Sequence, residues 1–204
     1  MTPKTTRRLR ALALAGALVG YSFTAGLDSP WRRHPVVQAG ATGAPLGLRP
    51  PRLWAGLRLG ALAAGVVTAG VAASTALPRV RAAMAERDLP SPALRWLALE
   101  IPAGTVWSEE TAFRAALGTV AAEAFGPAGG RLLQAAAFGL SHIPDARSTG
   151  EPVPGTVLVT GLAGWVFGVL AARSGSLAAP VLAHLAVNEA GALAALLVQR
   201  TGPS

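Results

Sequence analysis

The chain has 204 residues, of which 51% are hydrophobic and 14% are charged, and its mean hydropathy is +0.44. Ordinary soluble domains carry charge on about a quarter of their residues, so this composition excludes that class. The formal net charge is +8, but the basic residues are scattered between apolar runs without interleaved aromatics, which argues against nucleic-acid binding. There is no cysteine, so disulfides, thiolate metal sites and thiol nucleophiles are excluded.

The first half of the chain contains two apolar runs. We expect residues 11–27, which follow a basic N-terminus, to be an uncleaved membrane span, because the remaining chain is itself membrane-embedded and no A-x-A site closes the run. A cleaved signal peptide is the alternative. Residues 28–52 are rich in proline and predict a polar loop that contains His34. The second run, 53–77, is rich in Gly and Ala, which favours close helix packing in a membrane.

The polar composition of residues 79–92 predicts an exposed loop or surface helix. A long apolar element follows this segment. The element begins near residue 93 and ends near residue 125, which is too long for one straight membrane span. We expect a kink or break near Pro102 and Gly104, because proline removes a backbone donor and clashes with the preceding turn. Residues 126–130, rich in glycine, predict a turn.

The remaining elements are a short helix at 131–143, a proline-containing loop at 144–154, and spans at 155–172 and 177–199. Together the pattern predicts an all-α fold, a polytopic transmembrane helical bundle of about six membrane segments. We assign residues 1–92 to N-terminal membrane segments and loops, and residues 93–204 to the functional core. Basic residues flank both ends of the expected spans, so the charge pattern does not give the membrane orientation.

The stretch Trp107-Ser-Glu-Glu-Thr-Ala-Phe-Arg114 places two carboxylates and one arginine inside an apolar run. On a helix Glu110 and Arg114 lie four residues apart and face each other, so they can form an internal ion pair. Glu109 is rotated by about 100° and stays outside that pair. An ionisable side chain inside a membrane is costly, which makes Glu109 a functional candidate.

Other polar residues also fall inside apolar segments. A carboxylate and a histidine can deprotonate a water, and a second histidine with an amide can stabilise an oxyanion. Two imidazoles and a carboxylate could instead bind zinc, although no HExxH motif is present. The full set is Glu100, Glu109, Glu110, Arg114, Glu123, His142, His184, Asn188 and Glu189.

These polar residues include three motifs, each inside an apolar segment. In order and spacing, over about residues 93–200, the motifs resemble the signature of the CPBP family, which includes CAAX prenyl proteases, bacteriocin-processing enzymes and Abi-like proteins. One departure is Ala115, where many members carry glycine. The motifs are Glu109-Glu110-x-x-x-Arg114, Phe138-x-x-x-His142, and His184-x-x-x-Asn188.

The resemblance implies an intramembrane endopeptidase that hydrolyses a peptide bond in or next to the membrane. Its substrate would be a peptide or a membrane protein, and the enzyme would be a multi-pass protein of the bacterial plasma membrane. The carried-over roles are water activation by Glu109 and His142, oxyanion stabilisation by His184 and Asn188, and support of the motif helix by Glu110 and Arg114.

The family's use of a metal is disputed, and we favour a glutamate-activated water without tightly bound zinc. If zinc were used, Glu109, His142 and His184 would be its ligands. Two other functions remain open. One is a non-proteolytic scaffold or bacteriocin-immunity protein of the same family, and the other is a small transporter with a carboxylate proton relay. Glu123 and Glu189 are interpreted as interfacial or packing residues, and Glu100 is left unassigned.

Overall fold

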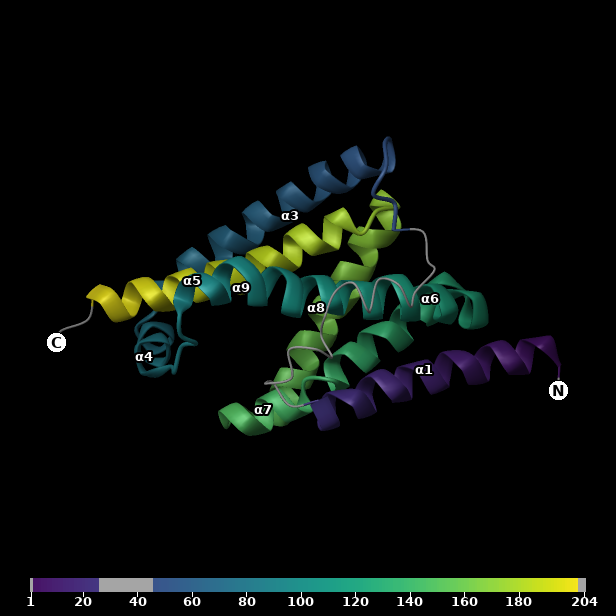
Figure 1. Cartoon of the computed structure of the whole chain (residues 1–204), viewed down its shortest axis with the longest axis horizontal. Coiled ribbons are helices and arrows are strands. Elements are labelled where there is room, and N and C mark those ends of the chain that lie inside the picture. Colours follow the sequence, from purple (N-terminus) through teal and green to yellow (C-terminus); the bar gives the residue numbers. More distant parts are fainter. Residues whose placement is uncertain (1, 26–45, 202–204) are drawn as a thin grey trace.

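The computed structural model describes residues 2–25 and 46–201. Within these ranges every regular element is a helix, which confirms the all-α fold class (Figure 1). The elements are α1 Pro3–Ala25, α3 Arg52–Thr75, α4 Pro78–Glu86, α5 Ala93–Arg95, η1 Trp96–Trp107, η2 Glu110–Leu117, α6 Gly118–Leu140, α7 Ile143–Thr149, α8 Val153–Ser174 and α9 Ala178–Thr201.

Three of the described helices, α3, α8 and α9, are long and apolar enough to cross a membrane. They coincide with the second, fifth and sixth spans expected from the sequence. The expected number of about six membrane segments therefore stays a prediction. So does the retention of the first span, although α1 packs against α6 through its buried residues Ala11 and Ala15.

The long element that begins at Ala93 is helical as far as a sharp turn at Gly126. Of the predicted kink or break near Pro102, the break is wrong, because Pro102 lies inside η1, a π-helix that continues to Trp107; the kink stays a prediction. The wider π turn displaces the carbonyl that the proline ring would otherwise meet, so the chain passes Pro102 without leaving helical geometry. The helical path ends at Gly126, whose φ of +77° favours glycine, at the predicted turn.

The two halves of α6, before and after Gly126, pack closely against each other. A Cβ added to Gly130 would lie 2.5 Å from the backbone nitrogen of Ala122, so this contact requires glycine. The second half of α6 also packs against α8, where a Cβ on Gly139 would meet the carbonyl of Val157 at 2.5 Å. These contacts bring the end of α6 beside α8.

Helices α3 and α9 run side by side in the same direction (Figure 1). Gly56 of α3 faces the turn before α9, and Gly60 faces the start of α9; added Cβ atoms would lie 2.7 Å from Ser176 and 3.0 Å from Ala179. Glycines spaced by four residues let two membrane helices approach closely. Helix α8 reaches α9 through a turn at Gly175, which has a φ of +63°.

Two predicted connections have different outcomes. The segment 79–92 is confirmed as largely exposed, with α4 as its surface helix. The loop expected at 144–154 is wrong, since α7 occupies its first half. Pro144 lies in the first helical turn, where no backbone donor is needed, and Gly150 ends the helix with a φ of +72°. Most of the predicted loop 28–52, including His34, lies outside the described residues.

Candidate active site

Two adjacent glutamates lie at the junction between the π-helical segments η1 and η2. The side chain of Glu110 is fully buried, whereas that of Glu109 is 22% exposed. π-Helical turns are rare in proteins, but those that do occur often lie at functional sites. The two carboxylates therefore share a locally unusual backbone and differ in their access from outside the protein.

Glu110 contacts two cationic or polar partners on different helices. Its Oε2 lies 3.1 Å from Nε of Arg114, and its Oε1 lies 2.8 Å from Nδ1 of His184 on α9. The internal ion pair expected from the i,i+4 spacing is therefore present. The Arg114 N–H is not directed at the carboxylate, so this contact is an ion pair, whereas the His184 contact is a hydrogen bond. A buried carboxylate needs such partners.

Arg114 is also held by two aromatic rings. Its guanidinium carbon lies 4.0 Å from the ring centre of Phe138 and 5.0 Å from that of Phe167. The side chain has no exposed surface, and its terminal nitrogens find no hydrogen-bond acceptor among the described residues. Cation–π contacts are strongest when the cation is desolvated, so these rings stabilise the buried guanidinium.

His184 lies between the two glutamates. Nδ1 contacts Glu110, while Nε2 lies 3.8 Å from Oε2 of Glu109. The imidazole stacks on Phe167 with ring centres 4.8 Å apart and an angle of 24° between the planes. Since Nδ1–H donates to Glu110, Nε2 is the nitrogen available for chemistry next to Glu109.

His142 lies at the end of α6, where it caps the start of α7. Its Nδ1 lies 2.8 Å from the carbonyl oxygen of Phe138, and its ring packs edge-on against the Phe138 ring with centres 4.7 Å apart. Nδ1–H donates to that carbonyl, which leaves Nε2 with a free lone pair. Within the described part of the chain, His142 forms no ion pair with Glu109.

Asn188 lies one turn after His184 on α9, as expected from their spacing. Its Nδ2 donates to the backbone carbonyl of His184 at 3.1 Å. The side chain is half-buried and turns toward its own helix, so the contact is with the backbone and not with the imidazole. The second Nδ2 hydrogen and Oδ1 remain available to a ligand.

The other polar residues lie away from this cluster. Glu100 pairs with Arg95 at 3.0 Å on the surface, with both side chains largely exposed. Glu123 is exposed near the N-terminus of α1, where it shares pocket walls with Arg7 and Arg10. Glu189 is half-buried on α9. None of the three contacts Glu109, Glu110 or His184 within the described residues.

The three residues that would bind zinc, Glu109, His142 and His184, are not arranged as a metal site. In residues 2–25 and 46–201 no three His, Cys, Asp or Glu side chains are arranged to hold a metal ion. The engaged Nδ1 atoms of His142 and His184 are not an obstacle, because their Nε2 atoms remain available, so it is the spacing of the side chains that does not fit.

Sequence reasoning missed the aromatic centre of the site. Phe138 packs against Phe113, His142, Phe167 and the guanidinium of Arg114, and its ring centre lies 6.0 Å from that of His184. The spacing of Phe138 to His142 signals a shared helix face. Phe167 carries no such signal, because it lies on a uniformly apolar helix, where any residue could face the core.

The site cluster consists of Glu109, Glu110, Arg114, Phe138, His142, His184 and Asn188. These side chains come from three segments that are distant in sequence, and each segment carries one of the three sequence motifs. Residues 91–190 match the family model described as type II CAAX prenyl endopeptidase Rce1-like. Over these residues the chain belongs to the Rce1-like family. The Rce1-like region contains every member of the cluster, and this family is one of membrane proteases that act on peptides. No curated protein and no solved structure matches the chain.

Proposed function

We propose that the chain is an intramembrane endopeptidase of the bacterial plasma membrane that hydrolyses a peptide bond in or next to the bilayer. The observation that carries the proposal is the pair of unequal glutamates beside one histidine. Glu110 is buried and engaged, whereas the neighbouring Glu109 is partly exposed and faces Nε2 of His184. Membership of the Rce1-like family supports the same reaction class.

Glu109 is the proposed general base. Its carboxylate takes a proton from a water, whose oxygen then attacks the carbonyl carbon of the scissile peptide bond. The accessible surface of Glu109 allows a water to reach it, whereas the buried Glu110 is already bound on both oxygens. The proton held by Glu109 then passes to the leaving amine, so the carboxylate is regenerated.

His184 and Asn188 are the proposed oxyanion donors. Nδ1–H of His184 donates to Glu110, so a proton on Nε2 makes an imidazolium whose charge the Glu110 carboxylate stabilises. Nε2–H can then donate to the tetrahedral oxyanion. Asn188 uses one Nδ2 hydrogen on the His184 carbonyl and keeps the other for the same oxygen.

His142 is proposed to assist proton transfer from its place beside the Phe138 ring. The Phe138 carbonyl fixes its tautomer and leaves Nε2 as an acceptor. His142 does not contact Glu109 directly, so its assistance requires substrate or water between the two residues. Glu110 and Arg114 position His184 and the motif helix without touching the substrate.

A peptide cleavage assay on the purified full chain tests this proposal. Quenched fluorescent peptides are offered to the wild type, Glu109→Ala, His142→Ala and the surface control Glu100→Gln. We expect turnover by the wild type and the control, none above background by Glu109→Ala, and no effect of a chelator. Equal turnover by all four proteins would refute the assigned site, and a chelator-sensitive activity would refute the metal-free mechanism.

The scaffold and immunity alternatives make a different prediction in cells. A scaffold keeps its phenotype when Glu109 is replaced by Ala, whereas a protease loses it. The transporter alternative predicts pH-driven flux in proteoliposomes. Loss of the cellular phenotype together with loss of peptide cleavage would leave the endopeptidase as the function that accounts for both.

A further inference from the structure

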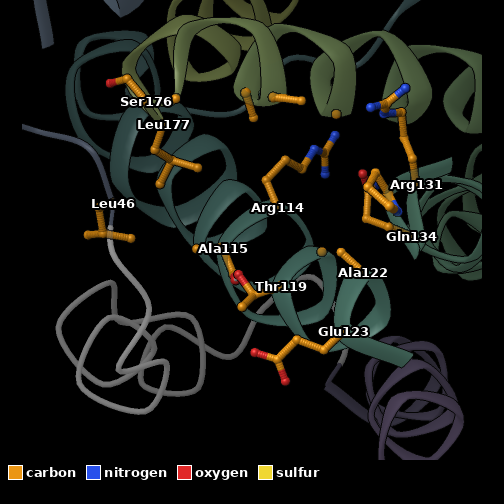
Figure 2. A pocket seen from close by; sticks show the side chains of 16 residues that line it. Leu46, Arg114, Ala115, Thr119, Ala122, Glu123, Arg131, Gln134, Ser176 and Leu177 are labelled. Carbon is orange, nitrogen blue, oxygen red and sulfur yellow. The ribbon is translucent and has the colours of Figure 1, made fainter. Parts of the chain in front are cut away.

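A cavity of about 440 Å³ lies between the two halves of α6 and the end of α8 (Figure 2). Arg114 forms part of its wall, but neither Glu109, His142, His184 nor Asn188 lines it. The cavity is therefore separate from the cleavage site described above, and Arg114 lies between the two.

The inner wall of the cavity is built from hydrogen-bond donors. Gln134 is only 2% exposed and its Nε2 finds no acceptor among the described residues, as is true of the terminal nitrogens of Arg114. Arg131 lies three residues before Gln134 on the same face of α6, and it forms no ion pair within the described ranges. Figure 2 shows Arg114, Arg131 and Gln134 gathered on one side of the cavity.

Other polar groups in the wall are already engaged. The Thr119 hydroxyl donates to the carbonyl of Ala115 at 2.6 Å, and the Ser176 hydroxyl accepts from the backbone N–H of Ala178 at 3.2 Å. Unsatisfied buried donors are costly, so the buried amide of Gln134 and the terminal nitrogens of Arg114 favour an acceptor-rich ligand, and the half-buried Arg131 adds a positive charge beside them. An anionic oxygen group meets that requirement.

Gly168 on α8 makes room for this arrangement. An added Cβ would lie 2.9 Å from Oε1 of Gln134 and 3.1 Å from Cγ of Arg131. The absence of a side chain there lets both residues pack against α8 with their polar ends at the cavity. Their placement is therefore supported by the fold and does not rest on two freely moving surface side chains.

One carboxylate also lines the cavity. Glu123 lies at its edge, and Figure 2 shows its side chain directed away from Arg114 and Gln134. On its other side Glu123 shares pocket walls with the basic residues Lys4, Arg7 and Arg10 of α1. These nearby positive charges oppose the repulsion that Glu123 would exert on an anion.

Basic residues collect at the end of the bundle where the cavity lies. The last turn of α8, which ends a membrane-capable helix, contributes Ala171 and Ala172 to the cavity wall. Lipid headgroups lie level with the ends of membrane-crossing helices. The basic end comprises Lys4, Arg7, Arg8, Arg10, Arg49, Arg52, Arg131 and Arg173, with Glu123 as its acidic residue. The charges toward the other end nearly balance, since Glu86, Asp88, Glu100, Asp145 and Glu151 lie there together with Arg79, Arg81, Arg87, Arg95, Arg147 and Arg200.

We propose that this cavity binds the phosphate group of an anionic phospholipid, with Arg131 and Gln134 as direct donors and the Arg114 guanidinium behind them. The ligand chemistry is that of a phosphate oxyanion, and the position at a helix end points to a lipid as its source. A lipid held here contacts the helix that carries Glu109, yet its binding does not depend on the proposed protease activity.

Native mass spectrometry of the full chain, purified in a neutral detergent, tests the proposal. Phosphatidylglycerol and phosphatidylcholine are titrated separately, with glycerol phosphate and inorganic phosphate as soluble probes. The variants are Arg131→Gln, which is half-buried at the cavity, and Gln134→Leu, which nearly keeps the volume. Arg173→Gln is the matched control, since it removes one exposed charge at the same helix end outside the cavity. Melting temperatures establish that each variant is folded.

We expect the wild type to prefer phosphatidylglycerol, and we expect Arg131→Gln to lose about tenfold in affinity, as removal of one charge-assisted hydrogen bond predicts. Gln134→Leu should lose less, and Arg173→Gln should bind as the wild type does. If Arg131→Gln and Arg173→Gln weakened lipid affinity equally, the lipid would bind through general surface charge and the proposed cavity site would be refuted. If soluble phosphate competed fully with the lipid, the proposal that the bound phosphate group belongs to a lipid would be refuted.

Discussion

Two ion pairs on one continuous helical stretch have nearly the same length and opposite surroundings. Arg95 and Glu100 are 3.0 Å apart with side chains 62% and 46% exposed, whereas Arg114 and Glu110 are 3.1 Å apart with no exposed surface. The exposed pair has no further partners among the described residues, while the buried pair is surrounded by two phenylalanine rings and His184. Distance alone therefore says little about what an ion pair does.

Burial decides the difference, because water competes with an exposed pair and side-chain entropy opposes it. A buried pair has lost its hydration and depends on its partners, so removal of one member leaves an uncompensated charge. The buried pair also fixes Nδ1 of His184, and so it links helix stability to the proposed chemistry. Four changes separate these effects.

The largest expected effect is on catalysis, from a glutamate that belongs to neither pair. Glu109→Gln removes the proposed base but keeps the size of the side chain, so turnover should fall by about 10²- to 10⁴-fold. Stability should change little, because Glu109 is partly exposed and makes only a 3.8 Å contact with His184. Peptide turnover and the melting temperature are measured on the same preparation, and a large loss of stability would contradict the assignment.

The buried pair should show the largest effect on stability. Glu110→Ala leaves Arg114 charged and unpaired and frees His184, so it should cost about 3–5 kcal/mol of unfolding free energy. Thermal unfolding in detergent measures the loss. The double variant Glu110→Leu with Arg114→Met should recover most of that stability without activity. A double variant as unstable as Glu110→Ala would show that packing, and not the unpaired charge, dominates.

The cation–π contacts also allow a buried interaction to be compared with an exposed one, with smaller expected effects. The guanidinium of Arg114 lies 4.0 Å from the Phe138 ring centre in the core, whereas that of exposed Arg8 lies 5.6 Å from the Phe125 ring centre. Phe138→Leu should cost about 2 kcal/mol and lower turnover, because the ring also packs against both histidines. Phe125→Leu should cost under about 1 kcal/mol. Equal losses in unfolding experiments would argue against a special role for Phe138.

The smallest effect is expected from the exposed pair. Glu100→Gln should change the unfolding free energy by less than about 1 kcal/mol and leave turnover at the wild-type value. Any change should shrink further as salt is added, because surface charges are screened. Unfolding at low and high ionic strength measures both quantities. A salt-independent loss would mean that Glu100 has a partner beyond Arg95.

The sequence was enough to predict the local features, namely the helices and the contacts within one helix. The i,i+4 spacing predicted the Glu110–Arg114 pair, and the composition predicted an all-α bundle whose long element begins at residue 93. It did not reveal the Glu110–His184 contact, because side chains 74 residues apart meet only through the packing of separate helices. The π turns were missed too, since the rule for proline assumes an ordinary α-helix and predicts a kink or break at Pro102.

The π-helical path also has a consequence for how the sequence tolerates insertions and deletions. In an α-helix each residue turns the chain by about 100°, so removal of one residue between Ala93 and Glu109 would swing the carboxylate away from α9. The wider turns of η1 hold more residues per turn than an α-helix does, so they give Glu109 an orientation that an α-helix of the same length would not give. The orientation of Glu109 is therefore encoded in the number of residues that precede it, and a shift of one position would inactivate the site while sparing the composition of every span.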